Sequence, residues 1–182
     1  MLRSLIDQGQ VVREGEHWRA TRTIIDAKIP DTLAGVLSSR IDRLPDMTKR
    51  VALAAAVIGR VFQHRVLETV CRAAPATERI DHVEPHIAAL AYEQLVRERM
   101  RDPEREYSFK HALTCDAAYE LLLRSRRREL HARAGAALEQ LYPERRDELA
   151  GMLAHHFSEA EDPRALAYSI KAAANARRLY AL

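Results

Sequence analysis

The chain has 182 residues, of which 47% are hydrophobic, 30% charged and 5% aromatic, with a formal net charge of +3. This apolar content can bury a core and excludes global disorder, and the scarcity of aromatic residues and glycine favours packed helices over a sandwich or barrel. No apolar run approaches the roughly 20 residues of a bilayer span, and no secretory signal pattern opens the chain, so we expect a soluble, cytoplasmic protein without a membrane partner. A charge this small does not by itself imply a nucleic-acid partner.

The N-terminal third predicts three short elements. Residues 2–9 have the pattern of a helix end closed by Gly9, and residues 11–18 predict a small hairpin around the EGE turn at 14–16. Asp31 is a suitable cap for a helix whose apolar residues repeat every three or four positions up to Leu44, and Pro45 ends it.

The pattern of the middle third predicts three helices followed by a hairpin, an order of elements that is typical of a winged helix. A helix over residues 46–58 ends at Gly59 before a turn at residues 60–62, and the next carries Val66, Leu67 and Val70. A further helix falls within residues 81–95. Residues 95–100 and 106–110 are short extended segments on either side of a proline-containing turn, DPE, at 102–104.

Beyond residue 112 the pattern changes to longer helices, predicted over residues 113–123, 130–141, 149–157 and 165–179. The last two share an inner face of mostly small residues, which allows the close approach that tetratricopeptide-type repeats require. Its members are Ala154, Phe157, Ala165, Tyr168, Ala172 and Ala176. The predicted fold is therefore mainly α, with a winged-helix-like domain and a small β-hairpin wing followed by antiparallel, tetratricopeptide-like helical hairpins.

Six stretches, in this order, carry a resemblance to a known family: residues 29–37 (IPDTLAGVL), 40–45 (RIDRLP), 55–62 (AAVIGRVF), 107–114 (YSFKHALT), 126–131 (RRRELH) and 153–157 (LAHHF). The chain resembles the segment that follows the ATPase core in bacterial signal-transducing ATPases with numerous domains (STAND ATPases), especially those fused to adenylate/guanylate cyclase or LuxR-type output domains. The resemblance divides the chain into the end of the ATPase helical lid and a linker (1–43), a winged-helix-like domain (44–115) and a helical, tetratricopeptide-like region (116–182).

In such proteins ATP or ADP is bound by a phosphate-loop core, the winged helix acts as a latch over the nucleotide, and the helical repeats receive protein partners. His111 resembles the histidine that contacts the ADP phosphates, and an imidazole can donate a hydrogen bond to a phosphate oxygen. None of the six glycines is followed by lysine, so the GxxxxGK(S/T) phosphate loop does not occur. We therefore expect no catalytic site and no cofactor in this chain itself; ATP or ADP would belong to an ATPase core outside it.

Other readings of the same residues remain open. His111 could equally be a core or surface histidine. The basic cluster Arg124, Arg126, Arg127, Arg128 and Arg133 could bind nucleic acid or an acidic partner, but a solvated helical face with ion pairs is the simpler interpretation. A DNA-binding winged helix is the alternative function, although its recognition helix would present Asp81, His82, Glu84, His86 and Glu93 rather than residues suited to base edges.

The cysteines and histidines of the sequence are further candidates for metal-binding or catalytic residues. Cys71 and Cys115 lack the spacing of a disulfide framework or zinc site and are expected to be small core residues. His155 and His156 point about 100° apart on a helix and have no third ligand at a suitable spacing, so they are interpreted as packing and surface residues. Glu129 with His131, and His111 with Cys115, could be drawn as catalytic pairs, but neither has a supporting third group.

Overall fold

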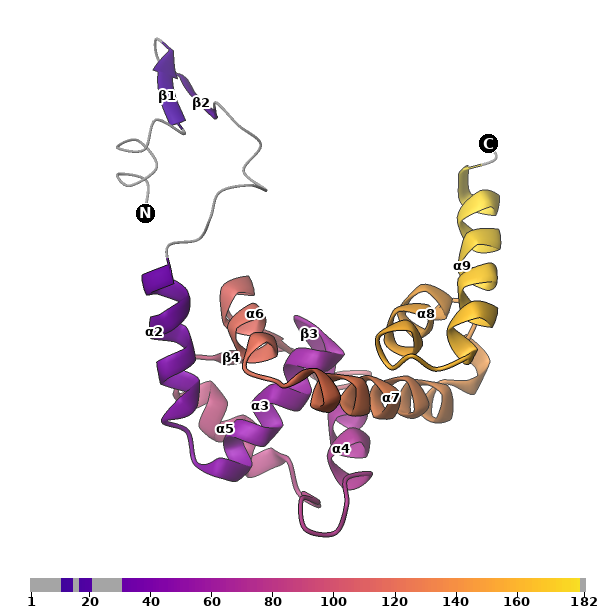
Figure 1. The fold of residues 1–182 in the computed structure, drawn as a ribbon, viewed down its shortest axis with the longest axis horizontal. Coiled ribbons are helices and arrows are strands. Elements are labelled where there is room, and N and C mark those ends of the chain that lie inside the picture. Colours follow the sequence, from indigo (N-terminus) through magenta and orange to yellow (C-terminus); the bar gives the residue numbers. More distant parts are fainter. Residues whose placement is uncertain (1–10, 15–16, 21–30, 181–182) are drawn as a thin grey trace. The chain divides into compact units, whose positions relative to one another are not determined.

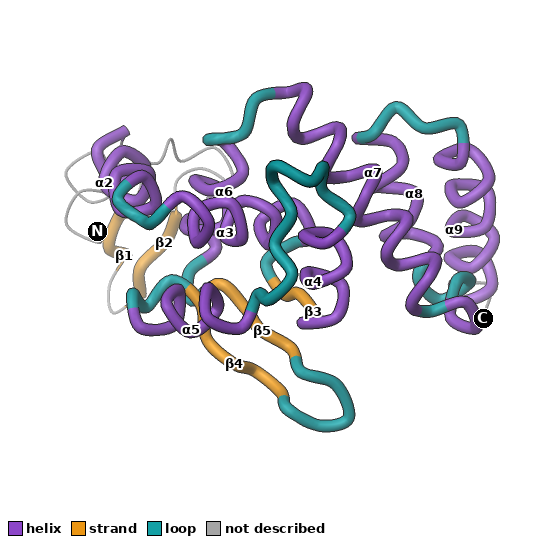
Figure 2. Tube along the Cα trace, turned by 90° about the horizontal axis from the view of Figure 1, so that it is seen from below, coloured by secondary structure: helices purple, strands orange, loops and turns teal. Residues whose placement is uncertain are grey.

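The computed structural model describes residues 11–14, 17–20 and 31–180 (Figures 1 and 2). The chain divides into two compact units, Met1–Gly35 and Val36–Leu182. In the first, β1 (Val11–Glu14) and β2 (His17–Ala20) pair antiparallel, which confirms the predicted hairpin. Its turn and the predicted helix end at residues 2–9 lie outside the described residues.

The second unit is mainly helical with a small antiparallel sheet, in agreement with the coarse prediction. Its elements are α2 (Asp31–Asp42, which begins within the first unit), α3 (Asp46–Ile58), β3 (Val61–Gln63), α4 (His64–Arg72), α5 (Glu84–Tyr92), β4 (Val96–Met100), β5 (Glu106–Phe109), α6 (Ala112–Glu120), α7 (Arg124–Leu141), a 3-10 turn at Pro143–Arg145, α8 (Ala150–Glu159) and α9 (Arg164–Tyr180). None of the described helices combines the length and the apolar character that crossing a membrane requires.

The ends of α3 follow from the local sequence. Pro45 precedes the first turn, where its fixed backbone dihedral is tolerated, and Asp46 places a negative charge at the positive end of the helix. At the other end Gly59 adopts φ 141°, a region that residues with a side chain rarely enter. The predicted bounds of this helix are therefore confirmed.

The three-stranded sheet has the order β3-β5-β4, and all neighbouring strands are antiparallel (Figure 2). Strands β4 and β5 form the predicted hairpin, whereas β3 was expected to be a turn. Phe62 of β3 is fully buried and pairs with Tyr107 of β5, with ring centroids 6.0 Å apart. Three residues give no recognisable alternation, so only the long-range pairing reveals this strand.

The boundaries of two later helices also differ from prediction. The helix expected over residues 113–123 ends at Glu120, and α7 begins at Arg124 rather than at residue 130. The first turns of α7 are rich in arginine and lack apolar periodicity, so the pattern misses them. They are held instead by ion pairs, including Arg126 Nη1 to Glu129 Oε2 at 2.6 Å.

One core runs through the second unit. Helix α3 packs against α4, α5, α6 and α7, and α7 also lies across α4 (Figures 1 and 2). The alanines at positions 52, 54, 55 and 56 of α3 are all buried, and their small side chains let the neighbouring helices approach closely.

Helices α7, α8 and α9 pack in sequence order, α7 on α8 and α8 on α9. Phe157 and Tyr168 are buried between α8 and α9, with ring centroids 5.7 Å apart and nearly parallel planes, and the guanidinium of Arg164 lies 4.0 Å from the Phe157 centroid. Of the predicted inner face, Ala154, Ala165 and Ala172 are partly buried, but Ala176 is exposed because it lies towards the end of α9.

Candidate functional sites

His111, the residue singled out from the sequence, lies where β5 passes into α6. Its backbone is extended, with φ −129° and ψ 140°, and its carbonyl accepts a hydrogen bond from the amide of Thr114 at 3.1 Å. The residue is exposed, and the first turn of α6 carries no acidic side chain. An imidazole beside the positive end of a helix dipole is a chemically suitable partner for a phosphate group.

The pair of His111 and Cys115, which the sequence already made an improbable catalytic pair, combines an exposed imidazole with a buried thiol. Cys115 is buried, and its Sγ lies 3.8 Å from the carbonyl oxygen of Ala56. Burial raises the pKa of this thiol to about 11 and that of the buried Cys71 thiol to about 12. Both cysteines are therefore small core residues, as expected, and neither is an activated nucleophile.

The arginine cluster on α7 is largely engaged in pairs. Arg124 and Arg128 both contact Glu161, at 3.3 and 2.9 Å, and Arg126 bonds to Glu78 and Glu129. The Glu129 carboxylate also pairs with Arg133, whereas both ring nitrogens of His131 bond to other residues, so Glu129 and His131 are not hydrogen-bonded to each other. Because Glu78 and Glu161 come from outside α7, these arginines join elements of the fold, which is more than the solvated helical face predicted from the sequence.

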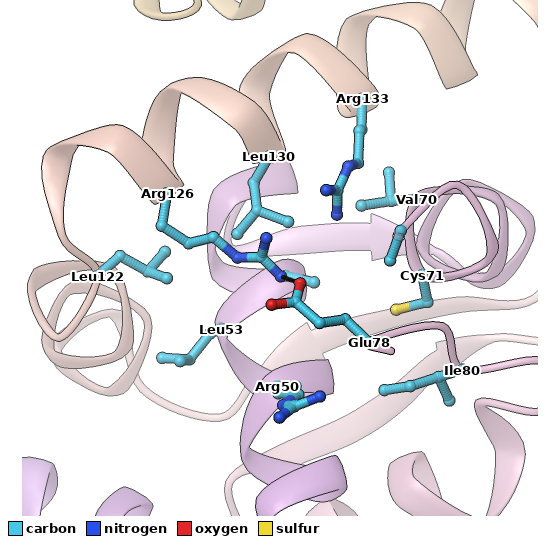
Figure 3. A pocket seen from close by; sticks show the side chains of 12 residues that line it. Arg50, Leu53, Val70, Cys71, Glu78, Ile80, Leu122, Arg126, Leu130 and Arg133 are labelled. Atoms are coloured by element: carbon cyan, nitrogen blue, oxygen red, sulfur yellow. Dashed lines mark hydrogen bonds and ion pairs between the residues drawn. The ribbon is translucent and has the colours of Figure 1, made fainter. Parts of the chain in front are cut away.

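A small cavity of about 50 Å³ lies between α3, α4 and the first turns of α7 (Figure 3). Arg50, Arg126 and Arg133 line it together with apolar side chains, and Glu78 reaches into it to bond Arg126. Since drug-sized ligands occupy pockets of roughly 300–1,000 Å³, this cavity suits one or two water molecules rather than a nucleotide.

A larger groove of about 690 Å³ lies between α2 and α5. Arg40 and Arg43 line one side, and the strongly exposed Tyr92 lines the other. The guanidinium of Arg40 donates to the carbonyl oxygen of Glu93 at 2.7 Å. This bond gives a partner to a backbone carbonyl at the C-terminal end of α5, where carbonyls have no partner within the helix. The same hydrogen bond joins α2 to the end of α5 across the groove.

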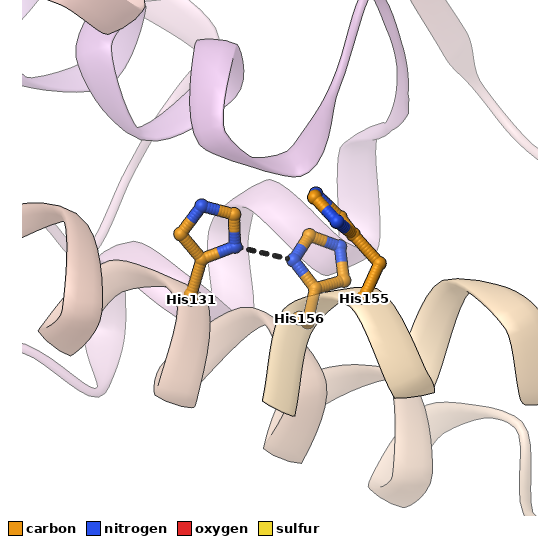
Figure 4. Close-up of side chains that lie close together, drawn as sticks. All are labelled: His131, His155 and His156. Atoms are coloured by element: carbon orange, nitrogen blue, oxygen red, sulfur yellow. Dashed lines mark hydrogen bonds between the residues drawn. The ribbon is translucent and has the colours of Figure 1, made fainter. Parts of the chain in front are cut away.

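Three histidines converge between α7 and α8 (Figure 4). His131 and His156 are each only 1% exposed, and their Nδ1 atoms lie 2.9 Å apart in a direct hydrogen bond. The exposed His155 completes the group, with its ring centroid 5.4 Å from that of His131 and 5.5 Å from that of His156. One nitrogen from each ring lies within 4.8 Å of those of the other two.

This grouping corrects the expectation that His155 and His156 have no third partner. The angle between neighbouring side chains holds for a single helix, but a second helix can supply a ring between them. His131 occupies the same helix face as Ala134 and Leu138, and His156 the same face as Leu153. Both positions belong to apolar helix faces, which is the signal that could have predicted their meeting.

Burial keeps the two inner rings neutral. It lowers the pKa of His131 to about 4 and that of His156 to about 3; His155 lowers the first further, and His131 and His155 lower the second further. His131 Nε2 lies 3.1 Å from the hydroxyl of Tyr119, whereas the buried Nε2 of His156 has no hydrogen-bond partner among the described residues.

Comparison with protein-family models, with characterised proteins and with solved structures found no match. The residues of the chain itself therefore carry the functional conclusions.

Proposed function

We propose that this chain is a non-catalytic regulatory and protein-interaction module of a STAND-type signal-transducing ATPase. In this proposal the winged-helix-like domain (44–115) latches the nucleotide state, and the tetratricopeptide-like helices (116–182) pass it to protein partners. The six ordered stretches of resemblance carry the proposal. Because no glycine of this sequence is followed by lysine, the proposal assigns nucleotide binding and hydrolysis to an ATPase core outside this sequence.

The order of elements supports the winged-helix part. Helices α3, α4 and α5 are followed by the β4–β5 hairpin, and β3, between the first two helices, pairs with β5 rather than with β4. Phe62 and Phe109 join the sheet to the helical core, with ring centroids 5.8 Å apart. A hairpin supported in this way is suited to act as a rigid flap.

The packing of the last three helices supports the interaction part. Consecutive helices pack on each other through small and aromatic side chains, as stacked helical repeats do. Leu166 and Ile170 on the outer face of α9 are 70% and 63% exposed, which leaves an apolar strip of the kind that receives a further helix.

His111 is the residue proposed to contact the ADP phosphates once an ATPase core is present. Its exposure at the start of α6, without a neighbouring carboxylate in the first helical turn, fits an anionic group. Loss of the imidazole should weaken the ADP-bound, closed form and leave the fold of the module intact.

Two experiments test the proposal. Calorimetry of the purified chain with ATP and with ADP should give no binding at micromolar concentrations, and ATP hydrolysis should be undetectable; micromolar binding would contradict it. The reading frame upstream of Met1 should encode a GxxxxGK(S/T) loop. With that core joined to the chain, His111→Ala should lower the ADP retained through purification, whereas His82→Ala, which changes another exposed histidine, should not.

The alternative function, a DNA-binding winged helix, has less support. On α5, the candidate recognition helix, the exposed positions are Glu84, Pro85, Ala88 and Tyr92. A backbone hydrogen bond and nearby cationic groups lower the pKa of Glu84 against a smaller opposing effect of burial, so its negative charge persists and repels phosphate. A salt-dependent gel shift with random duplex DNA would favour this alternative, and its absence would exclude it.

A further inference from the structure

The three histidines between α7 and α8 have no role in the nucleotide switch that we propose for the winged-helix-like domain. Two of the rings are buried and fixed by hydrogen bonds, while the third is exposed at the edge of the same group (Figure 4). The Nδ1 atoms of the two buried rings face each other across the helix interface, and one of them donates a proton to the lone pair of the other. Such a group resembles a set of metal ligands in which a single proton occupies the place of the ion.

We propose that His131, His155 and His156 form a binding site for a divalent transition-metal ion, with Zn²⁺ as the first candidate, and that the ion links α7 to α8. This site is independent of the proposed nucleotide switch.

The distances are close to those that a metal requires. Zn²⁺–N bonds of about 2.0–2.1 Å in a tetrahedral site place ligand nitrogens roughly 3.3 Å apart. The Nδ1 atoms of His131 and His156 are 2.9 Å apart, so the rings need to separate by only a few tenths of an ångström. His155 has the larger adjustment to make, and its exposed side chain is free to make it.

The surroundings of His131 fit a ligand that binds through Nδ1. Metal-bound histidines usually donate the other ring N–H to a fixed acceptor, which sets the ring orientation. Here the second nitrogen, Nε2, lies 3.1 Å from the Tyr119 hydroxyl oxygen. Tyr119 is itself covered by the Arg127 guanidinium at 4.5 Å from the ring centroid.

The incomplete hydrogen bonding of His156 also favours an additional ligand. Its Nδ1 is used by His131, but its buried Nε2 has no partner among the described residues. In Figure 4 this second nitrogen is on the side of His155. A buried polar atom without a partner is unfavourable, and a bound ion that carries water molecules into the site would supply one.

The donor set and the nearby charges define the class of ion. Three neutral imidazoles without a carboxylate or thiolate suit Zn²⁺, Ni²⁺ or Cu²⁺ rather than Mg²⁺ or Ca²⁺. Two charged groups act on His131, Glu159 with its negative charge and Arg127 with its positive charge. Glu159 acts more strongly on His131 than Arg127 does, so these two groups together do not repel a dication in this position.

The test is calorimetric titration of the chain, without a histidine tag, with ZnCl₂. We expect one Zn²⁺ per chain with a Kd of about 10 µM or tighter, a binding free energy within reach of a three-ligand site. Because His155 is exposed, His155→Ala should fold normally and weaken binding at least about tenfold. The matched control His82→Ala changes an exposed histidine elsewhere and should bind like the wild type.

Co²⁺ provides a second readout, since tetrahedral coordination gives visible absorption bands that the His155→Ala variant should lose. Zn²⁺ should also raise the Tm of the wild type, because an ion that binds only the folded state stabilises it. Absence of Zn²⁺ binding, a Kd weaker than about 100 µM, or equal affinity in the wild type and His155→Ala would overturn the proposal.

Discussion

Gly135 of α7 lies directly against the ring of Phe157 of α8: a Cβ added to this glycine would be 2.6 Å from Phe157 Cε1 and 2.8 Å from Cζ. Phe157 is fully buried and its ring contacts Tyr168 and Arg164. The contact fixes the distance between α7 and α8, and with it the position at which His131 and His156 meet.

Gly135→Ala should therefore destabilise the protein. Replacing glycine in a helix interior normally stabilises by up to about 1 kcal/mol, but over-packing a full core costs about 1–3 kcal/mol, so the net effect is a loss. The matched control is Gly151→Ala in α8, which meets nothing within 4 Å and should be neutral or slightly stabilising. Urea unfolding of the two variants measures the difference; equal midpoints would show that α8 can shift to accommodate the methyl group.

A hydrogen bond joins the β4–β5 hairpin to the end of α7. The Tyr142 hydroxyl donates to both Glu104 carboxylate oxygens, at 2.7 and 2.8 Å, and burial together with this bond raises the pKa of Tyr142. Tyr142→Phe should cost about 1–2 kcal/mol, because a charge-assisted bond is lost while Glu104 regains water. Hydrogen exchange should become faster in the hairpin, residues 96–109.

The control for that change is Tyr92→Phe. Tyr92 is 84% exposed, so loss of its hydroxyl should leave exchange in the hairpin unchanged. If Tyr142→Phe also leaves it unchanged, the bond does not couple the hairpin to the helical region.

The buried histidines predict a loss of stability in acid. Unfolded histidine has a pKa near 6.5, whereas the folded values are about 4 for His131 and about 3 for His156. Below pH 6.5 the unfolded chain binds protons that the folded chain cannot, so stability is fully present above this pH and falls as the pH decreases towards 4. Each such proton contributes a slope of about 1.4 kcal/mol per pH unit.

Urea unfolding between pH 7.5 and 4.5, with EDTA present to exclude metal, checks this expectation. The double variant His131→Leu/His156→Leu removes both rings and both hydrogen-bond partners and should show a clearly smaller pH dependence. His82→Gln, which changes an exposed histidine outside the group, is the matched control and should behave like the wild type. A wild type equally stable at pH 7 and pH 5 would mean that the rings take up protons in the folded state.

Burial of the two thiols predicts that they are unreactive in the folded protein. The thiolate is the nucleophile, and the pKa values of about 12 for Cys71 and about 11 for Cys115 leave almost none at pH 8. Iodoacetamide should therefore modify neither residue in native buffer and both in urea, as measured by intact-mass spectrometry. Rapid modification under native conditions would show that the core around α3 opens frequently.

Local sequence determined the elements whose ends are marked by proline or glycine. The bounds of α3 follow from Pro45 and Gly59, and the β4–β5 hairpin follows from the proline-containing turn between two extended segments. Apolar spacing likewise identified α4, α8 and α9, and the absence of a ligand or disulfide spacing identified both cysteines as core residues. These features depend on backbone dihedrals and on which face of a segment is apolar, and both are properties of neighbouring residues.

Only the tertiary structure decided which faces meet. β3 exists because Phe62 pairs with a strand more than forty residues later, and the histidine group exists because α7 and α8 pack at the distance that Gly135 permits. Sequence spacing on one helix cannot give the position of a second helix, since that position results from the packing of all the side chains between them.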